Sequence, residues 1–127
     1  MRYQGLILAA AALALLGPGA ALAAAEANFN ATTAGDLAAL CSATPDNGLG
    51  TAALNFCEGY LQGAVTVEMQ NMAPLRGHKL FCLPDPPPTR SQAMGEFVGW
   101  AQAVPDRLTQ STTDGLFRFL SERYPCP

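Results

Sequence analysis

The chain has 127 residues, of which 50% are hydrophobic and 13% are charged, and its formal net charge is −3. A chain of this length can bury one core but is too short to divide into two domains. It is acidic and contains no run of basic residues, so it has no electrostatic reason to bind nucleic acid or an anionic membrane surface. We expect neither partner.

Residues 1–23 have the layout of a secretory signal peptide. Arg2 supplies a positive start, an uninterrupted apolar run follows over residues 6–16, and small residues at Ala21 and Ala23 precede a cleavage position. The apolar run is shorter than the roughly 20 residues that span a membrane. We therefore expect an exported protein, with an uncleaved membrane anchor as the alternative.

Cleavage after Ala23 is the expected event, and cleavage after Ala24 or Ala25 fits nearly as well. The mature chain, residues 24–127, is then predicted to be a single domain. Without Arg2 it keeps six basic and ten acidic residues, which gives a charge of about −4.

An even number of cysteines in a small exported chain indicates disulfides, here two, formed by Cys41, Cys57, Cys82 and Cys126. Their wide spacing lacks the close cysteine pairs of zinc sites and of redox motifs. No metal is expected. Of the three possible pairings we favour Cys41 with Cys57 and Cys82 with Cys126, and the other two stay open.

Helical patterns occupy four segments, and no segment has a convincing strand pattern. The predicted helices cover residues 33–42, residues 51–72, a segment from Thr89 to Pro105, and a segment from Ser111 or Thr112 to Tyr124. Thr33 with Asp36 and Thr89 with Gln92 have the spacing of capping boxes. The expected fold class is all-α: a small disulfide-stabilised bundle of about four helices.

Two pairs of glycines stand four residues apart inside predicted helices: Gly59 with Gly63, and Gly95 with Gly99. Glycine costs a helix about 1 kcal/mol relative to alanine, so we expect a compensating close approach of helix backbones. Packing inside one subunit is the first interpretation. A glycine-lined homodimer interface is the second.

The chain offers few catalytic groups, and we expect neither enzymatic activity nor a cofactor. The cysteines are taken up in disulfides, the carboxylates are scattered, and the single histidine, His78, stands between Arg76 and Lys79 in a loop, where it is a poor metal ligand. The aromatic residues are expected to form core rather than a ligand pocket. Trp100 and Phe119 lie off the main stripes of their helices, so a contact surface is the alternative for them.

Four motifs in this order resemble the Rap/Tai family of immunity proteins from type VI secretion systems. The first is Phe29 with residues 33–37 (Thr-Ala-Gly-Asp-Leu) and 40–42 (Leu-Cys-Ser), and the second covers residues 56–64 (Phe-Cys-x-Gly-Tyr-x-x-Gly-Ala). The others are residues 81–84 (Phe-Cys-x-Pro) and residues 124–126 (Tyr-Pro-Cys). The motif residues that match are structural ones: cysteines, glycines and core aromatics.

This resemblance implies a periplasmic, all-helical protein, often a homodimer, that binds a secreted peptidoglycan amidase and blocks its active site. Such an inhibitor needs a rigid protruding element, because rigidity limits the entropy lost on binding. The loop over residues 73–88 is the candidate, with Arg76, His78 and Lys79 as partner-binding residues. A plain connecting loop is the competing interpretation. A periplasmic helical chaperone, or a cell-envelope binding module without a toxin partner, is the alternative function.

Overall fold

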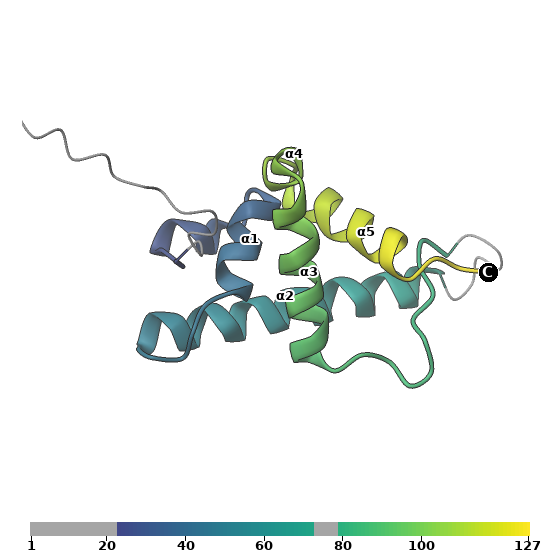
Figure 1. Ribbon diagram of the computed structural model, residues 1–127. Helices are drawn as coiled ribbons and strands as arrows, with labels where there is room; N and C mark the ends of the chain where they lie inside the picture. The colour runs from purple at the N-terminus through teal and green to yellow at the C-terminus, as the bar shows by residue number, and fades with distance from the viewer. Residues whose placement is uncertain (1–22, 73–78) are drawn as a thin grey trace, which may run out of the picture.

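The computed structural model describes residues 23–72 and 79–127, and within them the chain is helical with no strand (Figure 1). Four helices are longer than one or two turns, as predicted, and the all-α class is confirmed. Two short helical turns, η1 and α4, were not predicted. The elements are η1 (Glu26–Asn30), α1 (Ala34–Cys41), α2 (Gly48–Met72), α3 (Arg90–Ala103), α4 (Pro105–Leu108) and α5 (Thr112–Arg123).

The short helix α1 is the centre of the bundle. It contacts η1, α2, α3, α4 and α5, and in Figure 1 α3 stands beside it and α2 passes below it. Its buried residues, which lie on every side of the helix, are Ala34, Leu37, Ala38, Ala39, Leu40 and Cys41. A helix that is apolar all round is stable only inside a core, and this explains why the others pack on it.

Both predicted capping boxes are present. At the start of α1, the Asp36 amide donates to Thr33 Oγ1 at 3.1 Å and the Thr33 amide donates to Asp36 Oδ2 at 2.9 Å. At the start of α3, the Gln92 amide donates to Thr89 Oγ1 at 3.2 Å and the Thr89 amide donates to Gln92 Oε1 at 2.9 Å. Each pair satisfies two backbone donors that a helix start otherwise leaves open.

The two disulfides join Cys41 to Cys57 and Cys82 to Cys126, which confirms the favoured pairing. The first connects the end of α1 to α2, and the second connects the segment before α3 to the C-terminus. No helix within residues 23–72 and 79–127 is long and apolar enough to cross a membrane.

Phe119 belongs to the packed interior, and Trp100 is partly buried and packs against the core. Phe119 is only 1% exposed and meets Phe97 edge to face, with ring centroids 5.6 Å apart. The Trp100 ring stacks on Phe97 and carries the Arg107 guanidinium 4.3 Å from its centroid. Its indole N–H donates to Glu122 at 2.6 Å. The contact-surface alternative is therefore wrong for Phe119, and the Trp100 ring is already occupied by partners.

Close backbone approach occurs at glycines other than the expected pairs. A Cβ at Gly115 would lie 2.7 Å from Ala34 Cβ, and one at Gly35 would lie 2.9 Å from the Leu108 carbonyl oxygen. Around the two predicted pairs on α2 and α3, no described atom other than the nearby backbone of the same helix lies within 4 Å of such a Cβ. Packing of those pairs inside one subunit is therefore wrong.

Alanine substitutions should separate the two kinds of glycine. Gly115→Ala should lower the free energy of unfolding by about 1–3 kcal/mol, because the added methyl group overlaps α1. Gly99→Ala, in the open middle of α3, should raise it by about 1 kcal/mol through helix propensity. Urea unfolding of both variants measures these changes. A destabilised Gly99→Ala monomer together with an unaffected Gly115→Ala variant would contradict this packing.

Candidate functional site: an apolar pocket beside the proline segment

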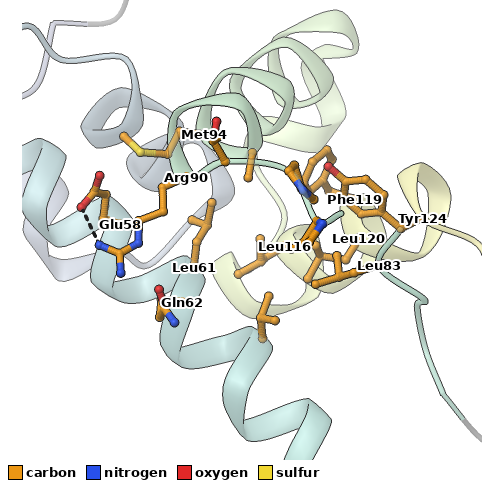
Figure 2. Close-up of a pocket in the computed structure, with 15 residues that line it drawn as sticks. Glu58, Leu61, Gln62, Leu83, Arg90, Met94, Leu116, Phe119, Leu120 and Tyr124 are labelled. Atoms are coloured by element: carbon orange, nitrogen blue, oxygen red, sulfur yellow. Dashed lines mark ion pairs between the residues drawn. The ribbon is translucent and has the colours of Figure 1, made fainter. Parts of the chain in front are cut away.

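An apolar pocket with a volume of about 390 Å³ lies between α2, α3, α5 and the proline segment, residues 83–88 (Figure 2). This volume falls within the range of roughly 300–1,000 Å³ that is typical of ligand-binding pockets. The deep wall is built by side chains that also belong to the hydrophobic core, so the pocket is part of the folded framework. These residues are Leu61, Met94, Leu116, Phe119, Leu120 and Tyr124.

The proline segment forms the outer wall through Leu83, Pro87 and Pro88. It has no helical hydrogen bonds of its own, so its position depends on its anchor. That anchor is Cys82, which is bridged to Cys126 and whose amide donates to the Tyr124 carbonyl oxygen at 2.8 Å. Phe81, the residue before Cys82, is buried (6% exposed) and anchors the chain at the same point.

The mouth of the pocket carries an ion pair between Arg90 of α3 and Glu58 of α2, with 3.6 Å between nitrogen and oxygen. Figure 2 shows this pair on the side facing α2, away from Phe119 and Tyr124. The Arg90 side chain is 67% exposed. It stands in the first turn of α3, which contains no acidic residue, although a helix N-terminus favours negative charge.

The opposite wall is held by Tyr124, whose hydroxyl donates to Glu96 Oε2 at 2.5 Å. Arg123 donates to both oxygens of the same carboxylate at 3.0 Å. The hydrogen bonds from Arg123, and then that from Tyr124, hold the pKa of Glu96 below its ordinary value of 4.5. Burial, together with the bond to Glu96, raises the pKa of Tyr124 to about 12.

Of the predicted partner-binding residues, Arg76 and His78 lie outside the described part of the chain. Lys79 is exposed and lines a second hollow of about 380 Å³ with Glu68, Met69 and Leu80. Glu68 Oε1 is buried there without a hydrogen-bond partner among the described residues. Met69 and Leu80 are more than half exposed. Lys79 therefore lies beside exposed apolar side chains.

The pocket itself was not predicted from the sequence. Its residues come from three helices and one loop, and each of the helical residues also fits an ordinary core stripe. The signals that could have indicated it are the cationic start of α3 at Arg90 and the fixed course of residues 86–88 (Pro-Pro-Pro). Within residues 23–72 and 79–127, no group of histidine, cysteine and carboxylate side chains could hold a metal ion.

The Glu96 cluster should make stability depend on pH. The folded-state pKa of Glu96 lies below 4.5. The stability that its carboxylate contributes is therefore fully present above pH 4.5 and is lost as the pH falls through the folded-state pKa. Glu96→Gln should lower the free energy of unfolding at pH 7 by about 1 kcal/mol, since the carboxylate is partly exposed. The loss of stability on acidification should also be smaller than in the wild type.

Glu58→Gln is the matched control, because its longer and exposed ion pair should contribute less than about 0.5 kcal/mol. Chemical denaturation at a series of pH values between 7 and 3 provides the comparison. If the free energy of unfolding of wild type and Glu96→Gln depended equally on pH, the hydrogen bonds to Glu96 would not account for the pH dependence.

Residues 33–126 match the model of a family described as Rap1a immunity proteins. No curated protein and no solved structure matches the chain at a significant level. The matched region contains α1 to α5, both disulfides and the whole apolar pocket. It also contains the cysteine-bearing motifs on which the resemblance to the Rap/Tai immunity proteins rests. The chain belongs to the Rap1a family of immunity proteins.

Proposed function

We propose that this protein is a periplasmic immunity protein that binds a peptidoglycan amidase secreted by a type VI system and blocks its active site. Residues 1–23 act as the signal peptide, and residues 24–127 form the mature domain. It acts by binding and not by catalysis. The observation that carries the proposal is the family match over residues 33–126, which favours an immunity protein over a chaperone or an envelope module.

The disulfides support this proposal. Disulfides form and persist in oxidising compartments such as the bacterial periplasm, and every cysteine among the described residues is bridged. A peptidoglycan amidase would act in the same compartment. The bridge at Cys82 also restrains the loop that we expect to enter the enzyme, and this lowers the conformational entropy lost on binding.

The inhibitory element that we propose is the loop over residues 73–88, with Arg76, His78 and Lys79 as contact residues. In the described part of this loop, the supporting observation is the set of side chains around Lys79. Lys79 lies next to exposed Leu80 and, across the second hollow, next to exposed Met69. Exposed apolar side chains that lie together, as Met69 and Leu80 do beside this hollow, favour a protein-binding surface.

The test uses the gene next to the one for this chain, which we expect to encode a small amidase with a catalytic cysteine and histidine. Periplasmic expression of that amidase should lyse cells, and co-expression of this protein should protect them. The triple variant with alanine at Arg76, His78 and Lys79 should bind at least tenfold more weakly in calorimetry with an inactive amidase. The control is Arg118→Ala, which removes one exposed cation on α5, outside the loop.

Lysis that continues in the presence of well-folded wild-type protein would contradict the proposed function. Protection by both the wild type and the triple variant, with equal affinities, would retain the function and discard the loop as its inhibitory element.

A homodimer is part of the proposal. The open space above Gly59, Gly63, Gly95 and Gly99 would let a helix of a second copy approach closely and would offset their cost to the helices. Sedimentation equilibrium should give a mass near that of two chains, and Gly59→Leu with Gly63→Leu should reduce it to one. A monomeric wild-type protein at high micromolar concentration would exclude this part of the proposal.

A further inference from the structure

We propose that the apolar pocket beside the proline segment is the receptor for one large apolar side chain of the amidase. This side chain is flanked on the amidase by a carboxylate that pairs with Arg90. The inference rests on the proposed function and names a second contact for it, separate from the loop over residues 73–88. In the complex, the amidase thus inserts this side chain, its anchor, into the pocket, while its active site binds the loop over residues 73–88.

The pocket meets the physical requirements for such an anchor. Strong contacts in protein interfaces are usually aromatic or large apolar side chains that fill preformed, desolvated pockets. The pocket is supported by the core, since Leu116 is 0% exposed, Phe119 1% and Leu120 4%. The surface left for a partner comes from half-buried lining residues, Val65, Leu83 and Ala93. Little rearrangement would therefore accompany the entry of an apolar group, and little conformational entropy would be lost.

Arg90 provides the charge complementarity at the mouth. Its 3.6 Å contact with Glu58 is longer than the 2.7–2.9 Å typical of a charge-assisted hydrogen bond, and its side chain is largely exposed. Most donors of the guanidinium are therefore available for a bidentate carboxylate. The positive end of the α3 dipole acts in the same direction, and the first turn of α3 supplies no acidic residue to neutralise it.

The surface around the mouth leaves room for the partner's backbone. A shallower hollow of about 260 Å³, lined by Asn55, Gly59 and Gln62, shares Glu58 and Arg90 with the pocket. A segment of the amidase can therefore reach the mouth over the exposed Asn55 and Gln62 while its anchor enters beside Arg90.

Filling the pocket tests the proposal. Ala93 lines the pocket from α3 and is half-buried, whereas Ala103 is the exposed last residue of the same helix. Ala93→Phe should weaken binding of the inactive neighbouring amidase by about 30-fold or more, the effect of losing a major anchor. Ala103→Phe should stay within about twofold of the wild type. Circular dichroism and thermal unfolding verify the fold of both variants.

A second experiment removes the charge of Arg90, which is exposed, so the substitution leaves the core unchanged. Arg90→Ala should weaken binding about tenfold, whereas Arg118→Ala, which also removes one exposed and ion-paired arginine, should stay within about twofold. Calorimetry at low and high salt should show that the Arg90 effect shrinks as salt screens the charge.

Tight amidase binding by Ala93→Phe and Arg90→Ala, together with loss of binding by the triple loop variant, would overturn this inference and leave the proposed function standing. Failure of the wild type to bind would overturn both. Native mass spectrometry adds one further outcome. A small apolar molecule bound to the wild type and absent from Ala93→Phe, with equal amidase affinities, would make the pocket a small-molecule site and overturn the inference.

Discussion

The Cys82–Cys126 bridge is the constraint on which the pocket depends. It closes a separation of 44 residues, and closure of a loop of that size stabilises the folded chain by about 4 kcal/mol in the chain-entropy model. The proline segment has no helical hydrogen bonds, so it is positioned by this bridge and by the hydrogen bond that the Cys82 amide donates to the Tyr124 carbonyl oxygen. The bridge therefore converts a loop into a wall.

The second bridge has a different role, because it connects the central helix to its neighbour. Cys41 ends α1 and Cys57 lies fully buried in α2, so the bridge fixes α2 against the helix that all other elements contact. Gly35 and Gly115 bring α4 and α5 close to that same helix. These contacts also position two residues that line the pocket, because Leu61 lies one turn after Cys57 and Leu116 follows Gly115. The helical side of the pocket is thus positioned by packing on α1, and the outer side by the Cys82–Cys126 bridge.

The sequence was informative wherever a contact is local or covalent. The capping boxes at Thr33 and Thr89 could be identified from spacing alone, because both partners lie within one turn. The first interpretation of the glycine pairs, packing inside one subunit, is wrong because spacing does not reveal which helix face is buried. The close approach at Gly115 could not be predicted because its neighbour Ala34 is distant in sequence. The pocket could not be predicted, since its walls meet only after α2, α3, α5 and the proline segment have packed.

Amide hydrogen exchange at Cys82 tests the bridge-held wall most directly. In the oxidised protein the Cys82 amide should be strongly protected from exchange. Its hydrogen bond to the Tyr124 carbonyl oxygen, at 2.8 Å, opens only when Cys82 separates from the chain that follows α5. Cys126→Ser removes the bridge and leaves the Cys82 amide in place as the probe, so in this variant the protection should disappear while α1 stays protected. A Cys82 amide that exchanges in the oxidised protein as fast as in an unfolded chain would contradict a preformed pocket.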